Sequence, residues 1–363
     1  MADKDKRSLQ RGWTTGACAA AAARAAYAAL LTGNFPDPVR IKLPGGTTPE
    51  FPLALKERDG ATARAGVLKD AGDDPDVTHG ALVIAEVAAA PPGHGVGFCA
   101  GPGVGTVTRA GLALAVGEPA INPGPRAIIT EALNDVASAC GQGLADAMVT
   151  LSIPGGEALA MKTLNGRLGI VGGLSILGTT GIVIPYSCAA WVHSIHRGID
   201  VARAAGVTHI AAATGSTSEA AVQKLYDLPE VALIDMGDFV GGTLKYLRRH
   251  KLPRLTIAGG FGKLAKLAQG HLDLHSNKSQ VDIAALVMQL RDLGASSAIL
   301  DAASKASGAN EVLVAATSEF AAALADRVAH QARAVALATL AGGIDVDVAI
   351  FDRHGELQAR AGA

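Results

Sequence analysis

The second half of the chain alternates segments typical of strands with segments typical of helices. Strands are expected at 208–213, 231–236 and 254–258, and each leads through a short loop of glycine or small polar residues into a helix. This alternation is typical of a parallel β-sheet covered by helices. Residues 191–363 are therefore expected to form a Rossmann-like α/β domain, in which ligands bind beyond the carboxyl ends of the strands.

The first half has a different pattern. An alanine-rich helix is expected at 17–31, with Thr14 as its N-cap and Gly33 at its end, because alanine is the best helix former and threonine is a good cap. This helix start should offer free N–H groups to an anion. The other expected elements, set among loops rich in glycine and proline, are strands at 39–43, 61–67, 81–88 and 147–153 and a helix at 126–139. Residues 1–190 are therefore expected to form an α+β domain with Gly-rich loops.

The composition limits the partners of the chain. It has 363 residues and a formal net charge of −1, without the concentrated positive face that nucleic acids and anionic membranes require. The uncharged segment 168–192 could span a bilayer by length, but its glycines, Pro185 and β-branched clusters favour buried strands and turns. Segment 1–7 has mixed charge and does not lead into a signal sequence. We expect a cytoplasmic protein that binds no nucleic acid and no membrane, and a homo-oligomer stays open.

The four cysteines are scattered, without the spacing of metal ligands or of a disulfide framework. Reduced, mostly buried thiols are therefore expected.

The segment 69–80 crowds four aspartates, one lysine and one histidine into a loop interrupted by glycine and proline. Carboxylates this close repel one another unless cations, backbone N–H groups or a ligand hold them. The loop runs directly into the strand expected at 81–88, so charge lies at the end of a buried framework, as in many active sites. A solvated acidic turn is the alternative interpretation.

Six motifs, taken in order from about residue 11 to 290, resemble one protein family. They are TTGACAAA at 14–21, the acidic loop 69–80, GEPAINP at 117–123, LNGRLGI at 164–170, GLSILGTTGIV at 173–183 and GDFVG at 237–241. The family that they resemble is the cobalt-precorrin-5B (C1)-methyltransferases of corrin biosynthesis, often called CbiD. One departure is Asn165-Gly166-Arg167, where the family pattern has Asn-Pro-Arg, and a turn accepts either.

The resemblance implies methyl transfer from S-adenosylmethionine to carbon 1 of a cobalt tetrapyrrole, which converts cobalt-precorrin-5B to cobalt-precorrin-6A. The implied cofactor is S-adenosylmethionine, and the implied partner is the small-molecule cobalt tetrapyrrole. Because the sulfonium methyl is already electrophilic, the protein mainly has to align the reactants and exclude water. We therefore expect no protein-bound metal, since the cobalt belongs to the substrate.

Residue chemistry narrows the roles within this implied reaction. Acetate and propionate groups of a tetrapyrrole favour cations and helix N-termini around it. The expected substrate contacts are Thr14, Thr15, Lys69, Arg126, Arg167, Lys263, Lys266, His271 and His275. For each lysine or arginine the alternative is a solvated surface charge. Asp73, Asp74 and His79, with Asp76 beside them, are expected to orient the substrate or to supply a base.

The cofactor is expected at the loops of the second domain. Asp235 follows Gly215 by twenty residues, a spacing that suits an acid that binds ribose hydroxyls. The expected cofactor contacts are Thr214, Gly215, Ser216, Asp235, Gly237, Gly259 and Gly260. A structural loop, with Asp235 capping the next helix, is the alternative.

Three other functions stay open from the residues alone. The first is an NAD-type oxidoreductase, although the GxGxxG fingerprint is missing. The second is a metal-dependent phosphoryl-transfer enzyme built on the aspartates, which predicts magnesium-dependent ATP turnover. The third is a tetrapyrrole carrier, which would bind the macrocycle without incorporating a methyl group.

Overall fold

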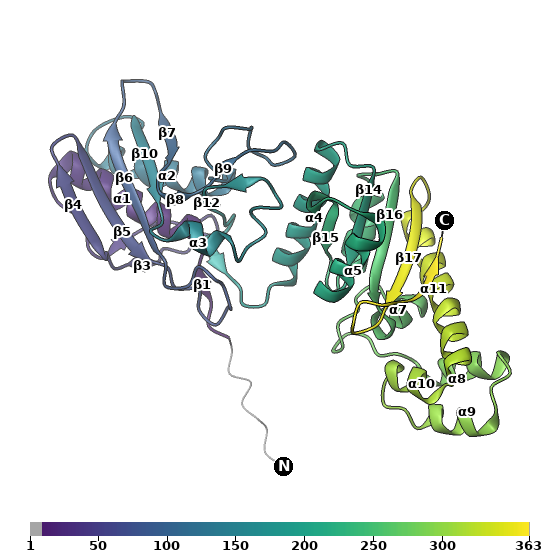
Figure 1. Ribbon diagram of the computed structural model, residues 1–363. Helices are drawn as coiled ribbons and strands as arrows, with labels where there is room; N and C mark the ends of the chain where they lie inside the picture. Colours follow the sequence, from purple (N-terminus) through teal and green to yellow (C-terminus); the bar gives the residue numbers. More distant parts are fainter. Residues whose placement is uncertain (1–8, 363) are drawn as a thin grey trace, which may run out of the picture. The chain divides into compact units, whose positions relative to one another are not determined.

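A computed structural model describes residues 9–362 of the chain (Figure 1). The chain divides into two compact units, Met1–Ser187 and Cys188–Ala363, called unit 1 and unit 2 below. Residues 1–8, which include the mixed-charge segment 1–7, lie outside the described residues, as does residue 363. Both units combine helices with sheets, so the chain has a mixed α/β fold.

Unit 1 is built on a five-stranded sheet with the strand order β4-β5-β6-β10-β7. Its strands are β4 (Leu55–Asp59), β5 (Thr62–Leu68), β6 (Leu82–Ala89), β7 (Val96–Ala100) and β10 (Ala147–Ser152). All neighbours pair antiparallel except β10 and β7, which are parallel. Alternate residues of β10 are buried and half-buried, so one face of the sheet packs against helices.

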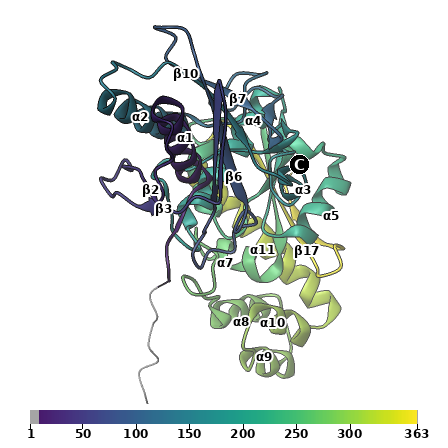
Figure 2. The same cartoon turned by 90° about the vertical axis from the view of Figure 1, so that its left-hand side faces the viewer.

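Two helices, α1 (Thr15–Thr32) and α2 (Pro123–Ala139), lie together on one side of this sheet (Figure 2). Nine alanines of α1 are completely buried, and their short side chains let the helix approach β5 and β6 closely. The predicted caps of this helix are confirmed: the Thr14 hydroxyl accepts a hydrogen bond from the N–H of Ala17, and Gly33 ends the helix with a left-handed conformation.

Cys18 lies within the buried face of α1, and burial raises the pKa of its thiol to about 12. All four cysteines are free, but Cys99, Cys140 and Cys188 are exposed. The expectation of mostly buried thiols is therefore wrong. A cysteine can be buried only where its own strand or helix face is covered, and position 18 alone meets that condition.

The rest of unit 1 consists of loops joined by short strand pairs. The pairs are β1 (Gly12–Trp13) with β13 (Ile182–Val183), β2 (Val39–Arg40) with β3 (Glu50–Phe51), β8 (Gly103–Val104) with β12 (Gly173–Leu174) and β9 (Thr106–Val107) with β11 (Ile170–Val171); the helix α3 is Gly156–Ala160. The uncharged segment 168–192 forms short strands and turns before α4 begins. Within residues 9–362, no helix has both the length and the apolar character needed to cross a membrane.

Unit 2 contains a second five-stranded sheet, with the order β15-β14-β16-β17-β18. Its strands are β14 (His209–Ala213), β15 (Leu233–Asp235), β16 (Arg254–Gly260), β17 (Asp345–Phe351) and β18 (Leu357–Ala361). The first four in this order are parallel, and β18 pairs antiparallel with β17. The strand expected at 231–236 is shorter than predicted, because Glu230–Ala232 forms a 3-10 turn (η1) after Pro229.

Helices cover both faces of this sheet. Ile210 and Ala212 of β14 face a large core that includes residues of α4, α6, α7 and α11, whereas Ala211 and Ala213 face a smaller core that includes α5. Strands buried on both faces are typical of parallel sheets. The helices of unit 2 are α4 (Cys188–Ala204), α5 (Ser216–Tyr226), α6 (Val240–Leu247), α7 (Phe261–Ala268), α8 (Ile283–Asp292), α9 (Ser297–Ser304), α10 (Ala309–Ala315) and α11 (Ser318–Leu340).

Candidate functional site

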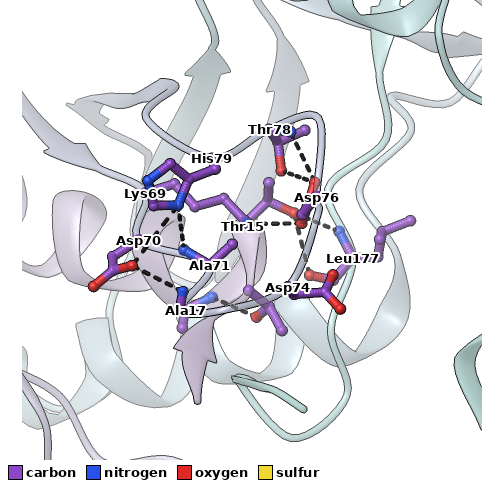
Figure 3. Close-up of polar contacts among 12 residues, drawn as sticks. Thr15, Ala17, Lys69, Asp70, Ala71, Asp74, Asp76, Thr78, His79 and Leu177 are labelled. Atoms are coloured by element: carbon purple, nitrogen blue, oxygen red, sulfur yellow. Dashed lines mark hydrogen bonds and ion pairs between the residues drawn. The ribbon is translucent and has the colours of Figure 1, made fainter. Parts of the chain in front are cut away.

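A buried lysine anchors the acidic loop of unit 1. The side chain of Lys69 is only 1% exposed, and its Nζ lies 2.7 Å from Oδ2 of Asp76 (Figure 3). The other oxygen of Asp76 accepts hydrogen bonds from the backbone N–H and the hydroxyl of Thr78, at 2.8 and 2.6 Å. Burial alone would raise the pKa of Asp76, but the hydrogen bonds from Lys69 and Thr78 outweigh it and hold the pKa below its ordinary value. Lys69 therefore balances the charge of Asp76 from the buried side of the loop.

The other three aspartates of the loop accept backbone N–H groups. The bonds are Gly72 N–H to Asp70 at 2.8 Å, Gln10 N–H to Asp73 at 2.6 Å and Tyr186 N–H to Asp74 at 2.8 Å. These dipoles stabilise the charged carboxylates, of which Asp70 and Asp73 are also exposed to water. The bonds of Asp73 and Asp74 thus tie the loop to two distant segments of unit 1, while Asp70, Asp73 and His79 stay exposed.

His79 lies at the end of the loop with its ring partly fixed. Its side chain is 57% exposed, and its Nδ1 accepts a hydrogen bond from the N–H of Ala71 at 3.1 Å. Because Nδ1 acts as an acceptor, the proton of the neutral ring is on Nε2. His79 therefore presents an N–H donor on its free side in this arrangement.

The start of α1 is joined to the motif at 173–183. The hydroxyl of Thr15 donates to the carbonyl of Leu177 at 3.3 Å and accepts from its N–H at 3.1 Å, and the N–H of Gly16 donates to the same carbonyl at 3.0 Å (Figure 3). The expectation of free N–H groups at this helix start is therefore wrong for Gly16 and Ala17. Ala17 donates to the predicted cap Thr14, whereas the acceptor for Gly16 is in a distant loop of unit 1 that the local sequence could not reveal.

Two glycines allow the acidic loop to cross the N-terminal segment with backbone against backbone. A Cβ atom on Gly12 would overlap the carbonyl group of Ala71, and one on Gly72 would overlap the carbonyl oxygen of Gln10. The crossing is fixed by hydrogen bonds from the N–H of Trp13 to Asp70 O at 2.7 Å and from the N–H of Asp73 to Gln10 O at 3.0 Å. Sequence reasoning missed Gln10 and Gly12, and the glycine was the signal that could have indicated a close approach.

The two predicted arginines of unit 1 lie in neighbouring motifs. Arg126, in the first turn of α2, donates to the carbonyl of Ile121 at 2.7 Å and to Glu118 Oε2 at 3.0 Å. Arg167 is half-buried in the turn at 164–170. Asn165, which sequence reasoning missed as a site residue, is buried and donates to the carbonyl of Gly173 at 3.2 Å. With the backbone bonds from Ile176 N–H to Ala120 O at 2.8 Å and from Asn122 N–H to Ile176 O at 3.0 Å, the bond from Asn165 knits the motifs at 117–123, 164–170 and 173–183 together.

In unit 2 all of the predicted cofactor residues lie at the carboxyl edge of the parallel sheet. Thr214 follows β14 directly, and its N–H donates to Ala258 O of β16 at 2.9 Å. A Cβ atom on Gly259 would lie 2.7 Å from the Thr214 hydroxyl, so only glycine fits beside this threonine. The loop after β14 is therefore in direct contact with the end of β16.

Asp235 ends β15 next to the end of β14. It lies opposite Ala213 in the sheet, and its carbonyl accepts a hydrogen bond from the indole N–H of Trp191 at 3.3 Å. Gly237, with a φ of +56°, turns the chain away beneath the Trp191 ring. The Asp235 backbone and the turn after it are thus covered by an aromatic residue that sequence reasoning did not select.

The two predicted lysines of unit 2 hold loops at the same edge. Lys263 Nζ lies 2.7 Å from the carbonyl oxygen of Thr214 and 3.0 Å from Oδ1 of Asp238. Lys266 donates to the carbonyl of Leu274 at 2.8 Å, and Leu274 N–H donates in turn to Asp238 O at 2.9 Å.

The predicted histidines His271 and His275 flank Leu274 in the loop that follows α7. Nδ1 of His275 accepts the N–H of Asn277 at 3.2 Å. The structure therefore brings this loop together with Lys263, Lys266 and the turn after β15. Among residues 9–362, no three side chains of His, Cys, Asp or Glu gather in a way that could hold a metal ion.

Comparison with known proteins gives matches along nearly the whole chain. A family model described as CbiD matches residues 2–185, and one described as the CbiD C-terminal domain matches residues 273–362. The chain is 59% identical to a cobalt-precorrin-5B C(1)-methyltransferase of Bradyrhizobium sp. (strain BTAi1), over 99% of this chain and 95% of that relative.

A protein of the same name from Paramagnetospirillum magneticum is 57% identical, over 97% of this chain and 98% of that relative. Another, from Brucella anthropi, is 56% identical, over 98% and 97%. A crystal structure of the cobalamin biosynthesis protein cbiD from Archaeoglobus fulgidus is 29% identical and covers 70% of this chain and 78% of that one, with a TM-score of 0.40.

Proposed function

The chain belongs to the CbiD family, and from this premise we propose that it transfers the methyl group of S-adenosylmethionine to carbon 1 of cobalt-precorrin-5B, giving cobalt-precorrin-6A in cobalamin biosynthesis. The observation that carries this proposal is the 59% identity to a C(1)-methyltransferase over 99% of the chain. Similarity at this level spans the acidic loop of unit 1 and the sheet edge of unit 2 alike.

The reaction requires the protein to align the two reactants more than to activate either of them. The bond from sulfur to the methyl carbon breaks as the bond from the methyl carbon to ring carbon 1 forms, and S-adenosylhomocysteine leaves. Because the sulfonium is already a good electrophile, the protein acts by holding both reactants in line and by excluding water. The cobalt ion is carried by the substrate.

We place S-adenosylmethionine at the carboxyl edge of the sheet in unit 2, as in a Rossmann-like domain. The connection through α5 leaves β14 toward β15, whereas the connection that begins with α7 leaves β16 toward β17, so the strand order reverses between β14 and β16. Ligands in open α/β sheets bind at such a reversal. Thr214, Gly215, Ser216, Gly259 and Gly260 surround this point. On this assignment Asp235 accepts hydrogen bonds from the ribose hydroxyls.

We assign substrate binding to the knitted motifs of unit 1, and substrate contact by His271 and His275 of unit 2 stays a prediction. The substrate carboxylates then meet Arg167 and the outer surface of the α2 start. Lys69 and Arg126 already have partners within the chain, so their part is to hold the surrounding loops. Asp73 and Asp74 fix the acidic loop, and the Nε2–H of His79 is available as a donor to a substrate carboxylate.

The test is a methyl-transfer assay with the purified chain. Cobalt-precorrin-5B and S-adenosylmethionine labelled with ¹³C in the methyl group are expected to give a tetrapyrrole labelled at carbon 1, detected by NMR. Macrocycle binding without label would support a carrier, and magnesium-dependent ATP turnover would support phosphoryl transfer. Either result, with no methyl incorporation, would exclude the proposal.

A further inference from the structure

Tyr186 has a backbone conformation that large side chains rarely adopt. Its φ is +57°, in the left-handed region, whereas most other residues of the described chain with positive φ are glycines. This conformation is unfavourable for a bulky L-residue and persists only where the surrounding structure holds it. Glycine at this position would avoid the strain, yet the chain has an aromatic residue there.

The acidic loop holds this strained residue. The N–H of Tyr186 donates to Oδ1 of Asp74 at 2.8 Å, a bond between residues 112 positions apart. The segment before it is fixed by the pairing of β13 with β1 and by the bond from the N–H of Thr14 to Gly181 O at 3.0 Å. The backbone on which Tyr186 stands is therefore rigid, although its side chain is 67% exposed.

Other exposed apolar side chains stand on the same segment. Leu177 is 50% exposed and Ile184 is 55% exposed, and the backbone of Leu177 is bound to the start of α1. Exposed apolar side chains along one rigid segment indicate a binding surface. They lie next to the motifs that we assign to the substrate, whose macrocycle has flat apolar faces and a rim of carboxylates.

We infer that Tyr186 packs its ring against a face of the tetrapyrrole macrocycle, flanked by Ile184 and Leu177, and that Asp74 positions it for this contact. This inference rests on the proposed function, because it takes the cobalt tetrapyrrole as the occupant. An aromatic ring suits the task, since stacking on a flat conjugated surface adds affinity with little loss of side-chain freedom.

The decisive variant is Tyr186→Gly, which separates binding from folding. Glycine relieves the positive φ, so the midpoint of thermal unfolding should be equal to or higher than that of the wild type. The probe is cobalt uroporphyrin, a cobalt tetrapyrrole with eight carboxylates, whose binding is followed by its Soret absorbance. Its Kd should rise about tenfold in this variant, while the Kd of S-adenosylmethionine stays unchanged. Tyr186→Phe keeps the ring and should keep the Kd within about twofold.

Asp227→Gly is the matched control. Asp227 has a φ of +50° at the end of α5 in unit 2, so the substitution relieves the same kind of strain away from Tyr186. It should leave the Kd of the probe unchanged. Asp74→Ala removes the acceptor for the Tyr186 N–H and should raise the Kd of the probe as Tyr186→Gly does. Asp74→Asn keeps a carbonyl acceptor and should bind the probe like the wild type.

The inference is overturned if Tyr186→Gly binds the probe like the wild type, or if it lowers the unfolding midpoint and weakens S-adenosylmethionine as well. A wild-type chain that leaves the probe unbound also overturns it. Each of these results is independent of the labelled-methyl assay. Normal methylation with a normal Tyr186→Gly variant rejects the inference alone, and probe binding without methylation rejects the proposed reaction alone.

Discussion

The acidic loop of unit 1 and the carboxyl edge of unit 2 each contain a lysine–aspartate ion pair, in very different surroundings. Lys69 and Asp76 lie 2.7 Å apart with side chains 1% and 26% exposed, whereas Lys263 and Asp238 lie 3.0 Å apart with side chains 39% and 23% exposed. When one partner of a buried pair is lost, the remaining charge stays buried without compensation. When one partner of an exposed pair is lost, water hydrates the remaining charge. The first pair therefore determines the shape of its loop, while the second only adjusts the position of a loop that the sheet already fixes.

Each unit contains one tryptophan, which allows this contrast to be measured. The backbone N–H of Trp13 donates to Asp70 O in the acidic loop, and the indole N–H of Trp191 donates to Asp235 O at the sheet edge. The chain has no other tryptophan. Fluorescence of the Trp191→Phe variant therefore reports on unit 1, and that of Trp13→Phe reports on unit 2.

The largest effect is expected for Lys69→Met. It leaves Asp76 without its cation and should lower the unfolding free energy of unit 1 by about 3 kcal/mol. Urea denaturation followed by Trp13 fluorescence measures this loss. Adding Asp76→Asn to the variant should recover part of the stability, because the neutral amide can still accept from Thr78. A single variant as stable as the wild type would show that the pair does not shape the loop.

The next largest effect is expected on cofactor binding in unit 2. Asp235→Ala should raise the Kd of S-adenosylmethionine by roughly tenfold or more, because hydrogen bonds to a charged acceptor contribute about 1.5–3 kcal/mol. Calorimetric titration measures the affinity, and binding of cobalt uroporphyrin in the same variant should be unaffected. Equal cofactor affinity in variant and wild type would move S-adenosylmethionine away from this edge.

Acid should weaken unit 1 through Asp76. The pKa of Asp76 is lower in the folded state, so its pair contributes full stability above the unfolded pKa of about 3.9, and the contribution is lost as the pH falls through the folded pKa. The unfolding free energy of unit 1 should therefore fall more steeply below about pH 4 in the wild type than in Asp76→Asn. Parallel pH profiles of the two proteins would contradict this assignment.

The smallest effect is expected for Lys263→Met. Its partly exposed pair should contribute about 1 kcal/mol or less to the stability of unit 2. Urea denaturation followed by Trp191 fluorescence provides the value, for direct comparison with Lys69→Met in unit 1. Equal losses of unfolding free energy in Lys69→Met and Lys263→Met would show that burial does not distinguish the two ion pairs.

Local signals allowed much of the framework to be predicted. The start and end of α1 were predicted because Thr14 and Gly33 act on neighbouring residues. The edge strand β4 was missed because its sequence LKERD is almost entirely charged, as suits an edge that must avoid pairing with other chains. β7 was missed because its glycine weakens the strand pattern.

The site was harder to predict than the framework, because its partners are distant in the sequence. The acidic loop was selected by its crowded charges, but the acceptor role of Asp74 toward Tyr186 depends on a contact across 112 positions. In the same way, nothing near Lys69 indicates that its side chain is buried. A sequence identifies which residues carry charge, whereas the fold decides which of those charges stay available for a ligand.

Because Cys18 is buried, the rate at which its thiol reacts reports on the opening of unit 1. Three exposed thiols should react promptly with an alkylating reagent, whereas Cys18 combines burial with a pKa of about 12 and should react only when α1 separates from the sheet. The delay before the fourth adduct appears in a mass spectrum would then measure how often unit 1 opens under native conditions. Substrate that binds the knitted motifs should lengthen that delay.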